Sequence, residues 1–183
     1  MAEVLRVIEP GILTTVQDLG RPGYQKFGIP VSGALDPVAL RLANALVGNP
    51  PGAAALEVTG GGVTLEVLAD CVVARAGADS PVFRDDRAVP GFCALRFLPG
   101  QRLRLGAPRA GLRTSLAIHG GFDVPPVLGS RSTCVRLGFG GLAGRALKAG
   151  DVLTAGAATV DLSSLRGRHL PPSARPLSRS PWI

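Results

Sequence analysis

Residues 54–76 read AALEVTGGGVTLEVLADCVVARA, three short runs whose apolar residues recur with a period of two. This period predicts strands at 54–59, 62–68 and 71–76, with the three glycines at 60–62 forming the first turn. The same pattern predicts strands at 3–8, 12–16, 93–97, 101–105 and 112–119, and the segment 148–154 is expected to turn into a last strand. Many short strands without regularly alternating helices favour an antiparallel barrel or sandwich.

The composition agrees with an aliphatic, β-rich domain of ordinary size. Glycine and proline number 25 and 16 of the 183 residues, as expected for short strands joined by tight turns. The hydrophobic content of 46% is ample for a packed core, and aromatic residues make up only 4%. The fold class expected is therefore mainly β.

One prominent helix interrupts this pattern at about residues 36–47. Asp36 is a good N-cap and Pro37 suits the first helical position, while Gly48 and the prolines after it end the helix. The apolar residues that fall at helical spacing are Val38, Leu42, Ala45 and Leu46.

The net charge of +7 lies in the second part of the chain. Residues 1–108 hold ten basic and ten acidic residues, whereas residues 109–183 hold ten basic and three acidic ones. A basic half can indicate nucleic acid, an anionic membrane surface or an anionic substrate. No helix-turn-helix, zinc-finger or RNP-like pattern occurs, and aromatic residues for base stacking are scarce, so no nucleic-acid partner is expected.

The cysteines and the N-terminus indicate an intracellular environment. Cys71, Cys93 and Cys134 are odd in number and lack CxxC spacing, so we expect buried reduced thiols and no metal site. No apolar signal region and no run of eighteen apolar residues occurs. We therefore expect a cytoplasmic protein without a membrane partner.

A glycine-rich first loop, residues 20–33, carries polar groups at its entry and exit. Asp18 and Arg21 either form an ion pair that fixes the loop or separate so that Arg21 binds a carboxylate or phosphate. Gln17 either bonds an amide substrate or satisfies loop backbone. Ser32 is both a turn residue and a candidate ligand for substrate.

Three further residues carry two interpretations each. Asp36 is chiefly a helix cap, and Asn44 in the helix faces either the core or the site. Glu57, in the middle of an expected strand, needs a partner if it is buried. Asn44 or basic groups of the loop are candidates, so Glu57 is expected to support the first loop.

A second loop, residues 120–144, has the same density of glycine, proline and polar groups. Ser130, Arg131, Ser132 and Thr133 place three hydroxyl groups around a guanidinium, which suits a carboxylate or phosphate, although such groups also cap turns. The GFGG segment at 138–141 lacks the nucleotide-loop patterns. His119 before this loop is expected to be a packed residue.

Eight segments occur in a characteristic order: VQDLGRPG, PVSGALD, LRLANALVGNP, AALEVTGGG, GQRLRLG, GGFDVPPVLGSRST, GFGGLAGR and LKAGDVL. In this order they resemble the biotin-dependent carboxyltransferase domain family of allophanate hydrolase subunit 2. That family includes the C subunit of 5-oxoprolinase and the carboxyltransferase part of urea carboxylase. The resemblance covers about residues 4–155. It implies cyclophilin-like β-barrels, and the second barrel of the family is not in this sequence. We expect an N-terminal lobe at 1–160 and a Ser-, Pro- and Arg-rich linker or tail at 161–183.

The resemblance implies a component of a 5-oxoprolinase complex, which opens 5-oxoproline to glutamate with ATP, or of a related carboxyltransferase acting on a small amide. ATP or carboxybiotin would come from partners, an allophanate-hydrolase-subunit-1-like and a LamB/YcsF-like subunit, with no covalently bound cofactor. The alternative is a non-catalytic binding or regulatory subunit that docks a related partner. The expected catalytic residues are Gln17, Asp18, Arg21 and Arg131, the expected substrate-binding residues are Ser32, Gly33, Asn44, Ser130, Ser132 and Thr133, and structural support is expected from Asp36 and Glu57.

Overall fold

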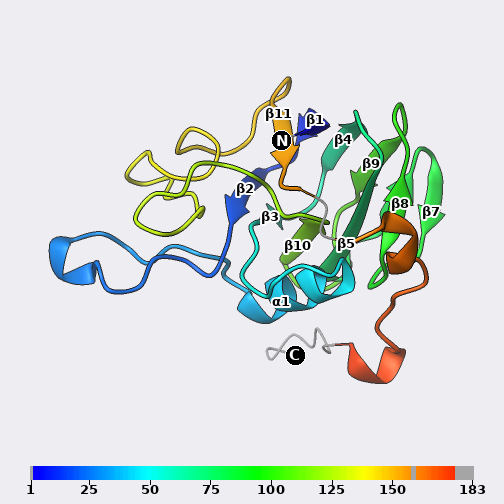
Figure 1. Cartoon of the computed structure of the whole chain (residues 1–183), viewed down its shortest axis with the longest axis horizontal. Coiled ribbons are helices and arrows are strands. Elements are labelled where there is room, and N and C mark those ends of the chain that lie inside the picture. The colour runs from blue at the N-terminus through cyan, green and yellow to red at the C-terminus, as the bar shows by residue number, and fades with distance from the viewer. Residues whose placement is uncertain (1, 158–159, 176–183) are drawn as a thin grey trace.

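The computed structural model describes residues 2–157 and 160–175 and consists mainly of two antiparallel sheets (Figure 1). The first sheet has the strand order β11-β1-β4-β9-β6-β7 and the second β2-β3-β10-β5-β8. The strands are β1 (Ala2–Pro10), β2 (Leu13–Gln17), β3 (Ala55–Thr59), β4 (Val63–Val67), β5 (Cys71–Gly77), β6 (Val82–Arg84), β7 (Arg87–Val89), β8 (Leu95–Phe97), β9 (Arg102–Leu105), β10 (Arg113–Ile118) and β11 (Val152–Ala155). The expected mainly β fold with one α-helix is confirmed.

The main core lies between the two sheets. Alternating residues of nearly every strand point inward, among them Leu5 of β1, Leu65 of β4 and Leu116 of β10, each at most 1% exposed. Fully burying one such leucine contributes about 1.5–3 kcal/mol. The core is aliphatic, as expected, with Phe97 and Phe122 as its aromatic members.

The helix α1 (Pro37–Leu46) packs on the outer face of the second sheet. The Asp36 carboxylate accepts a hydrogen bond from the backbone N–H of Ala39 at 2.9 Å, so the expected N-cap is present. The expected apolar face is only partly right: Leu46 is buried, but Val38 is 54% exposed.

The buried face of α1 combines small residues with two leucines, Leu40 and Leu46, and with Asn44. Ala39, Leu40 and Ala43 are at most 1% exposed and pack on alanines of the second sheet. Small side chains on both surfaces let the helix and sheet backbones come close together. Spacing alone could not choose between two apolar faces on a helix that is apolar nearly all round.

The segment after residue 160 packs against the second sheet. Its 3-10 turn η2 (Leu162–Leu165) ends in Leu165, which is fully buried beside α1, and η3 (Pro172–Ala174) follows. The backbone N–H of Ala94 donates to the carbonyl of Arg168 at 2.9 Å. Buried Leu165 and these backbone hydrogen bonds thus hold the described part of this segment on the second sheet. The assignment of residues 161–183 to a linker or tail stays a prediction. The boundary at residue 160 stays a prediction.

Within the described residues, no helix has the length and apolar character needed to span a membrane.

Candidate functional site

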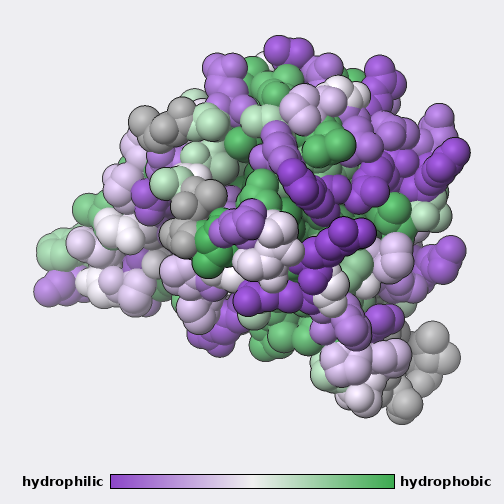
Figure 2. Space-filling view, turned by 45° about the vertical axis from the view of Figure 1, so that its right-hand side comes forward, coloured by the Kyte–Doolittle hydropathy of each residue, from purple (hydrophilic) through white to green (hydrophobic). Residues whose placement is uncertain are grey.

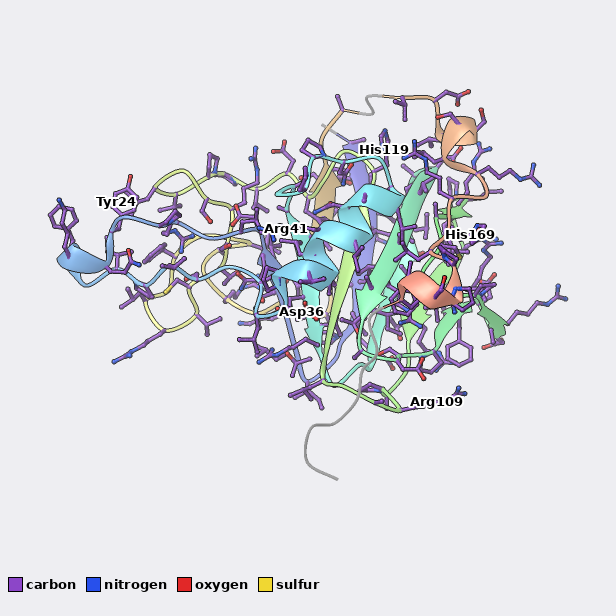
Figure 3. The ribbon with its side chains drawn as sticks, turned by 90° about the horizontal axis from the view of Figure 1, so that it is seen from below. Tyr24, Asp36, Arg41, Arg109, His119 and His169 are labelled. Atoms are coloured by element: carbon purple, nitrogen blue, oxygen red, sulfur yellow. The ribbon has the colours of Figure 1, made fainter. Side chains whose placement is uncertain are left out.

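The first loop projects from the barrel as a finger (Figure 1). Its 3-10 turn η1 (Gln25–Phe27) and Tyr24 lie at the far end (Figure 3). Gly33 allows the two legs of the finger to approach, because a Cβ there would lie 2.9 Å from the backbone nitrogen of Gly20. Ser32 beside it has a φ of 56°. The structure therefore gives Ser32 and Gly33 a role in shaping the finger.

The carboxylate of Asp18 joins the first loop to the second. Its Oδ1 accepts hydrogen bonds from the backbone N–H of Gly20 at 2.7 Å, from Ser130 Oγ at 2.7 Å and from Ser132 Oγ. Its Oδ2 accepts from the backbone N–H of Arg131 at 2.6 Å. A buried carboxylate needs such donors to offset its lost hydration. Two of the three hydroxyl groups expected to hold an anionic substrate, those of Ser130 and Ser132, therefore hold an anion of the chain itself.

Thr133 and Gln17 extend this junction to strand β2. The Thr133 hydroxyl donates to the Val16 carbonyl at 2.9 Å. The amide nitrogen of Gln17 donates to the Thr133 carbonyl at 3.2 Å and to Thr15 Oγ1 at 3.0 Å. Gln17 Oε1 is buried and has no hydrogen-bond partner. Gln17 thus satisfies loop backbone, one of its two expected roles, and Thr133 does the same.

Arg21 is 1% exposed and lies between the two loops. Its Nε donates to the Val127 carbonyl at 3.2 Å and its Nη2 donates to the Ser132 carbonyl, while its guanidinium carbon lies 4.9 Å from the centre of the Phe139 ring. Of the two arrangements considered for Asp18 and Arg21, the ion pair does not form. Arg21 Nη1 is buried without a hydrogen-bond partner. Arg21 therefore fixes the second loop and is not presented to solvent.

Arg131 differs from the other expected catalytic residues because its guanidinium reaches solvent. Its side chain is 41% exposed, and its Nη2 lies 3.3 Å from Oδ1 of Asp123. Both residues line a cavity of about 290 Å³ whose other walls include Gly120, Gly121 and Gly156. A partly exposed ion pair contributes about 1 kcal/mol or less. An incoming carboxylate can therefore replace Asp123 on Arg131 at small cost.

The glycines of the second loop pack against the loop itself. A Cβ at Gly144 would lie 2.1 Å from the backbone of Gly138. The N–H of Gly141 donates to the Arg131 carbonyl at 3.1 Å, and that of Gly144 donates to Gly140 at 2.7 Å. These N–H groups are engaged within the loop. The GFGG segment thus does not form the open N–H cradle that a nucleotide phosphate requires.

Asn44 lies away from the two loops, on the buried side of α1. Its side chain is fully buried, its Nδ2 donates to the Ala53 carbonyl at 2.8 Å, and its Oδ1 accepts from Asn49 Nδ2 at 2.9 Å. Asn49 bonds the carbonyl of Ile118 at 2.7 Å and the N–H of Gly120 at 2.9 Å. Of the two directions considered for Asn44, the structure thus has the one toward the core, with both ends of its amide engaged by backbone or Asn49. Its role in substrate binding stays a prediction.

Glu57 supports the exit of the first loop. Its side chain is buried, and its Oε2 accepts a hydrogen bond from the backbone N–H of Leu35 at 2.7 Å. Arg113 Nη1 lies 3.7 Å from Glu57 Oε1. Glu57 thus accepts a hydrogen bond from the chain that leaves the first loop, and the basic group paired with it is Arg113, which lies outside that loop.

The family model described as carboxyltransferase domain, subdomain A and B, matches residues 27–182. This chain belongs to that carboxyltransferase family. It is 48% identical over 164 residues to the C subunit of the Escherichia coli 5-oxoprolinase, an alignment that covers 90% of this chain and 53% of the relative. It is 39% identical to the urea amidolyase of Lachancea kluyveri, over 97% of this chain and 10% of that protein.

The solved structure of the Kluyveromyces lactis urea carboxylase has the same fold over this carboxyltransferase domain. The TM-score is 0.87 at 34% identity, with 98% of this chain and 17% of that chain covered. The chain spans about half the length of the E. coli relative and smaller parts of the longer enzymes. The resemblance inferred from the sequence motifs is confirmed.

The three thiols and His119 of this carboxyltransferase domain are separate from the hydrogen bonds described above between Asp18 and the two loops. Burial raises the pKa of the Cys71 thiol to about 12, and the charge of Asp70 adds to the rise, so this thiol stays protonated at neutral pH. Cys134 is also buried, whereas Cys93 is partly exposed, and all three are free. His119 is buried, with Nδ1 2.7 Å from the Val47 carbonyl. The described residues contain no cluster of His, Cys, Asp or Glu suited to a metal ion.

Sequence reasoning missed two residues that matter at the site. Asp123, in the GGFD segment, pairs with Arg131, and Asn49 ties α1 to the turn that enters the second loop. The signal for Asp123 was present, because this carboxylate follows Gly120–Gly121 after only one residue, in the turn after an expected strand. Asn49 next to Pro50 resembled an ordinary residue of a helix terminus.

Proposed function

We propose that this carboxyltransferase domain is a component of a 5-oxoprolinase, which opens 5-oxoproline to glutamate with ATP, or of a related biotin-dependent enzyme acting on a small amide. The observation that carries the proposal is the 48% identity to the C subunit of the E. coli 5-oxoprolinase over 90% of this chain. The proposed location of the complex is the cytoplasm. Residues 1–160 would be one lobe of a two-lobed domain, because the relative is about twice as long as this chain.

Within this proposal, Arg131 binds the anionic oxygen of the substrate or of its activated carboxyl group. Its guanidinium is half-exposed over the cavity, and its partner Asp123 is weakly held. A planar fork of N–H donors fits a carboxylate in two-point contact. The Asp18 network serves this role indirectly, since it fixes the Arg131 backbone from below.

ATP or carboxybiotin would reach the site from partner subunits. The closed packing of the glycines in the second loop supports this, because the described residues offer no phosphate cradle there. The partners that we propose are an allophanate-hydrolase-subunit-1-like subunit and a LamB/YcsF-like subunit.

A specific observation also favours the second candidate function, a non-catalytic subunit that docks a related partner. Large apolar side chains are exposed in the finger, directly after it and in the second loop: Phe27 is 68%, Leu35 70%, Val135 53% and Leu137 49% exposed. Meanwhile most polar groups expected to be catalytic are engaged in bonds between the loops. Exposed apolar side chains in one region commonly mark a protein interface.

The two functions are distinguished by a chimera of the E. coli relative, the 5-oxoprolinase component, in which the matching 164 residues come from this chain. The chimera is co-expressed with the proposed partner subunits, and ATP-dependent glutamate release from 5-oxoproline is measured. Restored release supports the enzyme. A chimera that folds and assembles with the partners but releases no glutamate would support the docking subunit instead.

A further inference from the structure

A pocket separate from the two-loop site lies between η2 and the second sheet. Its apolar wall includes Val72 of β5 and Leu95 of β8, and η2 closes the other side (Figure 1). The cavity has a volume of about 360 Å³, within the range of small-ligand sites. Figure 2 brings this side of the molecule forward and shows hydrophilic side chains bordering hydrophobic surface.

The wall that η2 provides is fixed to the barrel. Leu165 is fully buried, and the following segment is bonded to the chain before β8. The N–H of Leu170 donates to the Phe92 carbonyl at 2.9 Å, and Cys93 forms an isolated antiparallel bridge with His169. The pocket is therefore a built feature of the fold.

Three arginines line this pocket, Arg84, Arg96 and Arg166, and only one of them is paired with a carboxylate among the described residues. Arg96 Nε donates to Asp70 Oδ1 at 2.9 Å, and this ion pair balances its charge. Arg84 donates to the Arg96 carbonyl at 2.7 Å and stacks on Phe97, with 4.8 Å from its guanidinium carbon to the ring centre. Neither Arg84 nor Arg166 forms an ion pair with a carboxylate among the described residues.

One further carboxylate, that of Asp161, lies near the pocket but forms no ion pair with Arg84 or Arg166. Asp161 accepts hydrogen bonds from the backbone and hydroxyl of Ser163, and it interacts electrostatically with Arg96. Arg166, on the other end of η2, makes no side-chain hydrogen bond to a described residue. The pocket thus combines an apolar wall with two cations that lack a carboxylate partner.

We propose that this pocket binds a small organic carboxylate with an apolar body, whose carboxylate contacts Arg84 and Arg166 while its hydrocarbon part packs on Val72 and Leu95. Guanidinium groups suit a planar carboxylate because their donors form a fork of matching geometry. The apolar wall favours a ligand with a hydrocarbon part over an inorganic anion, which would leave that wall uncovered.

Hexanoate is a suitable probe, and hexanamide is its neutral counterpart of almost the same shape. We expect hexanoate to bind saturably in an NMR titration, shifting the amide signals of Ser163 and Leu165, and to bind at least ten times more tightly than hexanamide. Equal affinity of the two, an absence of saturable shifts at these residues, or equally tight binding of sulfate at the same residues would overturn the proposal.

Arg166→Gln removes one of the two cations from a solvent-facing turn, and Arg41→Gln removes an exposed arginine on α1 as the matched control (Figure 3). We expect hexanoate affinity to fall at least five-fold in Arg166→Gln and to stay unchanged in Arg41→Gln, with both proteins showing the native NMR spectrum elsewhere. Unchanged affinity in folded Arg166→Gln would contradict the assignment.

Discussion

At the scale of single residues, the main result concerns Asp18. The sequence marks it as a reactive group, yet its two carboxylate oxygens accept four hydrogen bonds from both loops. Arg21 and Gln17 likewise bond backbone carbonyls. These residues build the platform that places Arg131 over its cavity.

Asp18→Asn should destabilise the fold, because an amide places N–H donors against hydroxyl and N–H donors. We expect the free energy of unfolding in urea to fall by about 1–3 kcal/mol. Asp123→Asn, which changes a partly exposed partner of Arg131, is the matched control and should cost about 1 kcal/mol or less. Equal losses in the two variants would show that the Asp18 network contributes little.

Thiol reactivity tests the burial of the cysteines. Burial raises the pKa of both the Cys71 and the Cys93 thiol, but Cys93 is partly exposed whereas Cys71 and Cys134 are buried, so Cys93 should be the thiol that reacts in the native protein. At pH 8 we expect a colorimetric thiol reagent to titrate one thiol before unfolding and three after it. Cys93→Ser should abolish the native reaction, and persistence of that reaction in this variant would contradict the expectation.

At the scale of elements, the second loop depends on close packing at one glycine. Gly144 and Gly138 share a φ of 68°, but only at Gly144 would an added Cβ meet backbone atoms, 2.1 Å away, whereas at Gly138 nothing lies within 4 Å. The pair therefore separates the effect of steric contact from that of backbone conformation.

Gly144→Ala should lower the free energy of unfolding by about 1–3 kcal/mol more than Gly138→Ala does. Both variants share the cost of a left-handed backbone, which is about 1–2 kcal/mol for an alanine. Urea denaturation measures the difference. Similar costs for the two variants would mean that the loop relaxes freely around position 144.

Which elements could be predicted from the sequence depended on how strong their local signals were. The period-two runs identified β3, β4 and β5, and Asp36–Pro37 identified the start of α1. The three-residue strands β6 and β7 were missed because Asp85 and Asp86 interrupt the apolar pattern between them, whereas the equally short β8 was predicted within the longer run 93–97. The buried face of α1 was only partly identified because packing against small residues of β5 and β10 decides it.

At the scale of the whole molecule, the sequence indicated that two distant loops hold the site, and the structure brings them together through Asp18 and Ser130. The sequence alone could not show which of these groups face solvent. Asp18 and Arg131 both suit an active site by residue type, but the fold buries one and exposes the other. The direction of Asn44 stayed open for the same reason, since it depends on how α1 packs.

Acid stability offers a test of how the second loop is attached to β11. Arg145 donates to both carboxylate oxygens of Asp151, at 2.7 and 2.9 Å, and this holds the pKa of the Asp151 carboxyl below its ordinary value. The pKa of Asp151 in the folded protein thus lies below its value in the unfolded chain, which is about 3.9. The ion pair therefore stabilises the folded protein fully above about pH 3.9, and this stabilisation is lost as the pH falls through the folded pKa.

Arg145→Gln should therefore lower the free energy of unfolding at pH 7 and make it fall less steeply below about pH 4. Urea denaturation across pH 2–7 measures both effects, and Arg136→Gln, in the same loop, serves as the control. A variant with the wild-type slope below pH 4 would show that this ion pair does not contribute to the acid sensitivity.

The most direct test of the proposed site is kcat/KM for 5-oxoproline in the chimera carrying Arg131→Gln, compared with Arg136→Gln. Losing a charged hydrogen bond worth about 1.5–3 kcal/mol should lower kcat/KM at least ten-fold in Arg131→Gln. The Arg136 variant should keep the activity of the unsubstituted chimera, and the midpoint of urea unfolding should be the same in all three. Equal kcat/KM in the two variants would contradict the role of Arg131 at the site.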